Sequence, residues 1–188
     1  MLDRLQAATR PQCEAFEAGA LAFVGRCTAD ELRAHLGRCY GFEAPLESAF
    51  ALAPMLTRHT ATSRPRTRYI AHDLVELGLS PERLLELRPC PLGPFRNLAQ
   101  ALGWLFVAER NVLTNNTCHR LLASRAPELA ARETYLDCYG PALQPRWQRF
   151  GIALERAAAH AEPAHVEASA VESYGMLRRW LLPDQTRA

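Results

Sequence analysis

Lysine is absent from this chain, and arginine supplies all 22 of its basic residues. The 20 acidic residues leave a net charge of only +2, which argues against nucleic acid as a partner. No apolar run reaches the length of a membrane-spanning helix, and the N-terminus lacks the charged-then-apolar order of a secretion signal. The sequence therefore predicts a cytoplasmic protein with no nucleic-acid or membrane partner.

Metal and disulfide signatures are missing as well. None of the six cysteines forms a C-x-x-C pair, and no histidine stands at zinc-finger spacing from a cysteine. Cysteines of cytoplasmic proteins are usually reduced. We therefore expect six free thiols.

Strand alternation and internal repeats are not found either, whereas apolar residues recur at three- and four-residue steps along the chain. Helices are expected over residues 2–25, 29–40, 45–53, 69–77, 96–122, 145–161 and 166–182, with short helices after Pro81 and Pro127. A length of 188 residues suits one domain. The sequence predicts a single all-α domain over residues 1–188, with seven to nine helices.

Local signals set the expected helix ends. Thr28 and Glu31 have the spacing of a capping box, which predicts a helix start at Ala29. Pro11 predicts a kink or a fresh start within the first helix, and Gly41 predicts an interruption of the second. Residues 57–68 are predicted to form a solvated loop with four arginines; the alternative is a docking surface for an acidic partner.

The helix expected over residues 96–122 changes character along its length. Its first half is apolar, and polar side chains then fall on faces that should lie near the core. Such groups need hydrogen-bond partners or a water-filled pocket. Either the helix emerges at the surface over its C-terminal half, or these side chains line a pocket. The polar residues are Arg110, Asn111, Thr114, Asn115, Asn116 and Thr117.

Five stretches carry motifs that occur in a fixed order, namely residues 5–17, 39–47, 72–78, 101–109 and 139–150. They include an Ala-Thr…Glu pattern, Tyr-Gly…Pro-Leu-Glu, Asp-Leu…Leu-Gly, a Val-x-Glu ending and Trp-x-x-Phe. Together they resemble the haem oxygenase family, particularly its bacterial members that make bilins. The resemblance covers nearly the whole chain and implies the family's multi-helical fold. It also implies haem as cofactor, O2 as co-substrate and an external electron donor.

The chain departs from the family at both faces of the haem pocket. Cys13 stands where the family has its proximal histidine, although the flanking Thr9 and Glu17 are kept. The family's glycines after the shared Glu109 are replaced by larger side chains in residues 110–115. The resemblance places the candidate haem-contacting residues at Arg10, Cys13, Glu17, Arg110, Asn111, Thr114 and Asn115, with Cys13 as the candidate iron ligand.

These replacements change the expected chemistry. Glycine allows a helix backbone to lie against the haem face, whereas Arg110 and Thr114 crowd it. Arg110 either occupies the place of the macrocycle or pairs with Glu17 or another carboxylate as a strut that plugs the cavity. A thiolate from Cys13 would favour O–O cleavage, which does not suit ring oxygenation.

Three functions follow from this comparison. The first is a divergent member that no longer opens haem and that binds another ligand, such as a linear tetrapyrrole, or regulates a partner. The second is an active haem oxygenase with altered iron ligation, which yields biliverdin, CO and iron. The third is a thiol-dependent enzyme or redox protein that uses Cys13 as its reactive group.

Overall fold

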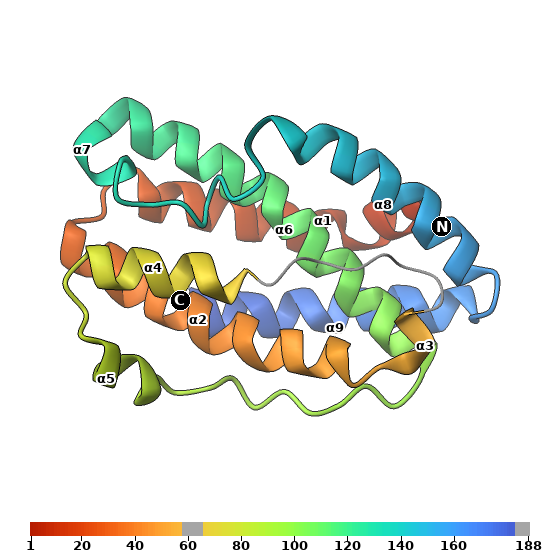
Figure 1. Cartoon of the computed structure of the whole chain (residues 1–188). Helices are drawn as coiled ribbons and strands as arrows, with labels where there is room; N and C mark the ends of the chain where they lie inside the picture. The colour runs from red at the N-terminus through yellow and green to blue at the C-terminus, as the bar shows by residue number, and fades with distance from the viewer. Residues whose placement is uncertain (58–65, 183–188) are drawn as a thin grey trace.

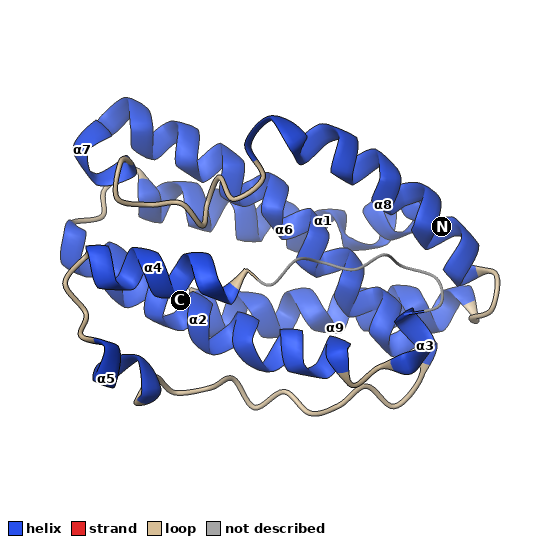
Figure 2. Ribbon diagram, in the orientation of Figure 1, coloured by secondary structure: helices blue, strands red, loops and turns tan. Residues whose placement is uncertain are grey.

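The computed structural model describes residues 1–57 and 66–182, and this part of the chain is helical without any strand (Figures 1 and 2). Its elements are α1 (Leu2–Val24), α2 (Ala29–Ala51), α3 (Pro54–Thr57), α4 (Thr67–Glu76), α5 (Pro81–Leu85), α6 (Leu98–Arg125), α7 (Pro127–Ala130), the 3-10 helix η1 (Gly140–Ala142), α8 (Leu143–Ala158) and α9 (Pro163–Leu181). The predicted all-α fold class is confirmed.

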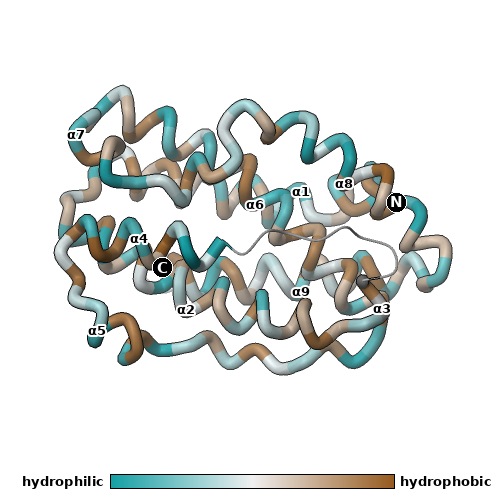
Figure 3. The backbone as a smooth tube through the Cα atoms, viewed as in Figure 1, coloured by the Kyte–Doolittle hydropathy of each residue, from teal (hydrophilic) through white to brown (hydrophobic). Residues whose placement is uncertain are grey.

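The long helix α6 is the centre of the packing, and it crosses the molecule diagonally in Figure 1. Helices α1, α7, α8 and α9 all pack against it, and α9 also packs against α1 and α2. Brown and teal residues alternate along the helices in Figure 3, as expected when one face of each is buried. The Asn97 side chain caps α6 by accepting a hydrogen bond from the Gln100 amide at 2.9 Å.

Gly103 sets the distance between α6 and α9. A Cβ at this position would lie 2.7 Å from the amide nitrogen of Ala170 and 2.7 Å from Oγ of Ser169. The Ser169 hydroxyl in turn donates a hydrogen bond to the carbonyl of Gln100 at 3.0 Å. The two backbones therefore approach as closely as they do because position 103 has no side chain.

Gly103→Ala is expected to lower the free energy of unfolding by about 1–3 kcal/mol, because the added methyl group would force the backbones apart. Gly37→Ala on α2 is the matched control, since its Cβ would have Leu87 as nearest neighbour at 3.4 Å. The control should be neutral or stabilising, because alanine is the better helix former. Urea unfolding followed by circular dichroism measures both; equal midpoints for Gly103→Ala and the parent would contradict the account.

The predicted interruption at Gly41 is wrong, because α2 runs unbroken from Ala29 to Ala51 with Pro45 inside it. Pro45 has no N–H to donate to the carbonyl of Gly41. That carbonyl instead accepts a hydrogen bond from the Cys90 amide at 2.7 Å. The carbonyl of Arg88 also packs where a Cβ of residue 41 would stand. Gly41 therefore seats the connector after α5 against α2 and does not end the helix.

Of the other predicted helix boundaries, one is confirmed and several are wrong. The capping box is confirmed, since the Glu31 amide donates to Thr28 Oγ1 at 3.3 Å and the Thr28 amide donates to Glu31 Oε2 at 2.8 Å. The predicted fresh start near Pro11 is wrong, because α1 is continuous. α6 extends past its predicted end, and α8 and α9 begin slightly before their predicted starts.

The predicted solvated loop over residues 57–68 is only partly described. Residues 58–65, with Arg58 and Arg64, lie outside the described residues, so the acidic-partner alternative is untested. Arg68 is exposed and lies over the ring of Tyr69, with Cζ 4.7 Å from the ring centroid. Arg66 is buried, so the prediction of a solvated side chain is wrong there.

Candidate functional site

A polar cleft lies between α1 and α6. Its volume is about 270 Å³. The lining residues are Gln6, Thr9, Arg10, Cys13, Glu14 and Glu17 of α1 with Phe106 and Arg110 of α6. Four of the seven candidate residues thus meet in one cleft: Arg10, Cys13, Glu17 and Arg110. The helical spacing of the α1 residues explains this, because steps of three and four place side chains on one face.

Arg110 spans the cleft from the α6 side. Its Nη2 donates to Glu17 Oε2 across the cleft at 3.5 Å, and its Nη1 donates to Thr114 Oγ1 one turn along α6 at 3.4 Å. Both members of the ion pair are partly exposed, with side-chain exposures of 21% and 30%. The predicted strut between Arg110 and Glu17 is therefore present, and it narrows the cleft.

Cys13 lies on the same face of α1 and is 8% exposed, and a residue of a third helix, α9, lies beside it. Its thiol interacts with the side chain of Tyr174 on α9. Burial raises the pKa of Tyr174, and Cys13 raises it further, so the phenol is protonated at neutral pH. No histidine of the described chain lines the cleft. A proton acceptor beside the thiol would have to be Glu14 or Glu17.

The other candidate residues of α6 are buried and do not line the cleft. Asn111, Thr114 and Asn115 are 4%, 2% and 9% exposed, so α6 does not emerge at the surface over these residues. The side chain of Asn115 interacts with Tyr135. The Asn111 amide oxygen is buried and has no hydrogen-bond partner in the described part of the chain. The predicted pocket lining on α6 therefore reduces to Arg110, with Thr114 as its support.

A second polar cluster, which the sequence analysis missed, joins α2, α4 and α6. Arg66 donates through Nη2 to Glu43 Oε2 at 3.0 Å and through Nη1 to the carbonyl of Ala108 at 3.0 Å. The Tyr135 hydroxyl donates to Glu43 Oε1 at 3.0 Å. The side chains of the ion pair are only 3% and 2% exposed. Burial raises the pKa of Glu43, and the charge of Arg66 opposes this shift.

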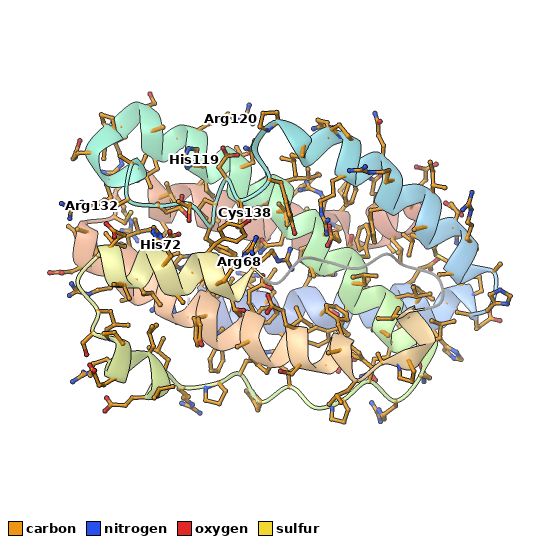
Figure 4. All side chains as sticks on the ribbon, in the orientation of Figure 1. Arg68, His72, His119, Arg120, Arg132 and Cys138 are labelled. Carbon is orange, nitrogen blue, oxygen red and sulfur yellow. The ribbon has the colours of Figure 1, made fainter. Side chains whose placement is uncertain are left out.

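The segment between α7 and α8 closes over this cluster, and the labels Arg68 and Cys138 in Figure 4 mark where it meets the start of α4. Asp73 of α4 is fully buried and accepts from the amides of Thr134 and Tyr135 at 2.9 and 2.8 Å. Burial raises the pKa of Cys138 to about 12. The hydrogen bonds to Asp73 therefore fix the part of this segment that precedes η1.

Two further pairs tie the same segment and α8 to α6. Arg146 of α8 makes a two-point contact with Glu109, at 3.1 Å from Nε and 2.9 Å from Nη2, and its Cζ lies 4.3 Å from the ring centroid of Tyr139. His119 Nδ1 lies 3.2 Å from Glu133 Oε2, and this hydrogen bond raises the pKa of His119. These contacts act as a scaffold that fixes α8 and the segment before it on α6.

The missed cluster had a weak signal in the sequence. Glu43 and Glu109 fall on helix faces that are otherwise apolar, which marks them as buried carboxylates in need of partners. Arg66 stands before the helix predicted over residues 69–77, in a segment rich in polar residues, so no periodic pattern marks it as buried. Its burial follows only from the way α4 docks on α2.

All six cysteines are free thiols. Burial raises the pKa of Cys27, Cys39, Cys90, Cys118 and Cys138. Within residues 1–57 and 66–182, no three His, Cys, Asp or Glu side chains are grouped so that they could hold a metal ion. Over the same ranges, no helix combines the length and apolar character that a membrane crossing requires.

Comparison of the chain with known protein families, with curated proteins and with solved structures finds no significant match to any of them.

Proposed function

We propose that this protein is a divergent haem-oxygenase-like binding protein that does not open haem and that uses the α1–α6 cleft for a ligand. The observation that carries the proposal is the Arg110–Glu17 ion pair across the cleft. Its two residues lie at motif positions that the resemblance assigns to opposite faces of a haem pocket. We place the protein in the cytoplasm, where its six free cysteines would stay reduced.

Haem does not fit this cleft as it stands. A volume of about 270 Å³ lies below the range of about 300–1,000 Å³ that is usual for ligand pockets. Arg110 crosses the space, and the residue at the position that the resemblance gives to the axial ligand is the thiol of Cys13 and not an imidazole. The charged residues of the lining are Arg10 and Arg110 with Glu14 and Glu17, so an acidic ligand can pair with both guanidinium groups only if it displaces Glu17 from Arg110.

A linear tetrapyrrole has the required features, because its two propionates can pair with Arg10 and Arg110 and its flexible chain can adapt to a narrow cleft. Binding of this kind would break the Arg110–Glu17 pair. The occupied and empty proteins would then differ at the α1–α6 contact, which gives a route to regulation of a partner.

Titration of the purified protein with biliverdin is expected to give a saturable absorbance change. Haem is expected to give no saturable Soret band, and ascorbate in air should yield no bilin. Arg10→Gln should weaken biliverdin binding by about tenfold, because one charge-assisted contact is lost. Arg149→Gln is the control, since Arg149 is exposed on α8 outside the cleft.

Three other results would favour a different function or reject the proposed ligand. Conversion of added haem to a bilin under ascorbate would establish the active oxygenase in place of this proposal. Biliverdin binding that is absent, or that Arg10→Gln leaves unchanged, would reject the tetrapyrrole as ligand. Reaction of Cys13 with a thiol reagent much faster than the other five cysteines would favour the thiol-dependent function.

A further inference from the structure

A larger cavity lies on another side of the molecule, at the junction of α2, α4, the connector after α5 and the end of α9. Its volume is about 540 Å³, within the usual range for ligand pockets and twice that of the α1–α6 cleft. It shares no lining residue with that cleft. Leu74, Leu79 and Leu87 contribute apolar surface to its wall, so most of what a ligand would touch is hydrocarbon.

The walls of this cavity are held by hydrogen bonds to backbone carbonyls of α2. The indole Nε1 of Trp180 donates to the carbonyl of Arg38 at 2.8 Å, which fixes the end of α9 against α2. The Cys90 amide donates to the carbonyl of Gly41 at 2.7 Å, which fixes the connector on the same helix. Both hydrogen bonds hold the segments around the cavity in fixed positions. The cavity is therefore already formed before a ligand binds.

One of the arginines around the cavity has partners already. Arg33 Nη2 lies 2.8 Å from Asp30 Oδ1, and Nη1 donates to the carbonyl of Leu77 at 3.0 Å. Asp30 is the only acidic residue in the lining. The negative charge of the cavity wall is therefore committed to Arg33.

Three other arginines line the cavity without such a partner. Arg38, Arg88 and Arg179 have no carboxylate within ion-pair distance in the described part of the chain. The Nε of Arg38 is buried and has no hydrogen-bond partner there. The neighbouring His35 offers no negative charge. Guanidinium groups that lack a carboxylate partner and lie beside an apolar wall complement an anion that carries a hydrocarbon body.

We propose that this cavity binds an amphipathic organic acid, with its carboxylate held by Arg38, Arg88 and Arg179 and its hydrocarbon body against the leucine wall. The site is separate from the α1–α6 cleft and does not depend on the function proposed for that cleft. A neutral molecule of the same shape would leave the three guanidinium groups without a counter-charge. Discrimination should therefore rest on the acid group.

Isothermal titration calorimetry with octanoate tests the proposal, with 1-octanol as the neutral match. Octanoate should bind saturably with one site per chain, and 1-octanol should bind about tenfold more weakly or not at all. Arg88→Gln combined with Arg179→Gln should weaken octanoate by about tenfold or more, because both residues are exposed and their charges are lost without a folding defect. Ala34→Trp, which places a large ring in the cavity from an exposed position, should abolish binding.

Controls separate this site from the cleft and from surface charge. Arg149→Gln on α8 and Arg10→Gln in the cleft should both bind octanoate as the parent does. The proposal is overturned if octanoate shows no saturable heat, if 1-octanol binds equally well, or if the double arginine variant binds as tightly as the parent. Weaker biliverdin binding in Arg10→Gln with octanoate binding unchanged would support two independent sites.

Discussion

Replacement of Arg66 by methionine is expected to lower the free energy of unfolding by about 3–5 kcal/mol, the cost of breaking a buried ion pair from one side. The Arg66 and Glu43 side chains are 3% and 2% exposed, so water cannot replace the lost partner. The carbonyl of Ala108 would also lose its hydrogen bond from Nη1. Chemical denaturation of parent and variant, followed by circular dichroism, measures the difference.

The cost should depend on pH in a defined direction. Burial raises the pKa of Glu43, and removal of Arg66 takes away the cation that opposes this shift. A carboxyl group whose pKa is higher in the folded than in the unfolded protein costs stability once it must ionise in the folded state. The loss of unfolding free energy in Arg66→Met should therefore be largest at pH values above the raised pKa of Glu43. It should shrink as the pH falls toward the unfolded value of about 4.3.

Two controls define this prediction. Arg66→Met with Glu43→Gln removes both charges and keeps an acceptor for Tyr135, so it should recover a large part of the lost stability. Arg4→Met breaks an exposed pair with Glu167 and should cost less than about 1 kcal/mol. A cost for Arg66→Met as small as that of Arg4→Met would show that the buried pair contributes little.

The triple variant Cys13→His, Arg110→Gly, Thr114→Gly is expected to gain a saturable haem Soret band that the parent lacks. Removal of the guanidinium clears the space that now holds the Arg110–Glu17 pair, and the glycines let the α6 backbone approach a flat ligand. Histidine then supplies the imidazole ligand. Haem titration followed by optical absorption measures the gain, and we expect the triple variant to saturate at a haem concentration about tenfold or more below the highest one at which the parent shows no saturable band.

Matched variants separate opening of the cleft from ligation. Arg110→Gly with Thr114→Gly should bind haem without the spectrum of histidine ligation, whereas Cys13→His alone should remain blocked by Arg110. Each glycine costs about 1 kcal/mol of helix stability, so thermal unfolding of every variant must be recorded. Haem affinity in the opened variants equal to that of the parent would rule out Arg110 as the plug.

The α1–α6 cleft was predictable because its α1 residues follow a simple rule. Arg10, Cys13 and Glu17 lie three and four positions apart, and this spacing alone puts them on one helix face. Their meeting with Arg110 was expected from the resemblance to a fold in which two helices face one another. Asn111 and Asn115 were assigned to the same pocket but lie on other faces of α6, where the packing of neighbouring segments decides their surroundings.

The continuity of α2 shows where local signals fail. Glycine and proline predict helix breaks because each removes local stabilisation. In this fold the carbonyl left free by Pro45 bonds with the Cys90 amide, from a segment far along the chain. Arg66 was likewise assigned to solvent by the polar residues around it, whereas its partner Glu43 lies on a different helix.

The sequence by itself determined the all-α class, the capping of α2 and the face of α1 that carries Cys13, because these depend on interactions within about two turns of helix. Tertiary structure alone decided that Glu43 would hold Arg66 and that three arginines would stand around an apolar cavity, and it decided between the two alternatives for Arg110 by pairing it with Glu17. Those outcomes depend on how helices cross, and the crossing is set by packing between residues far apart in the chain.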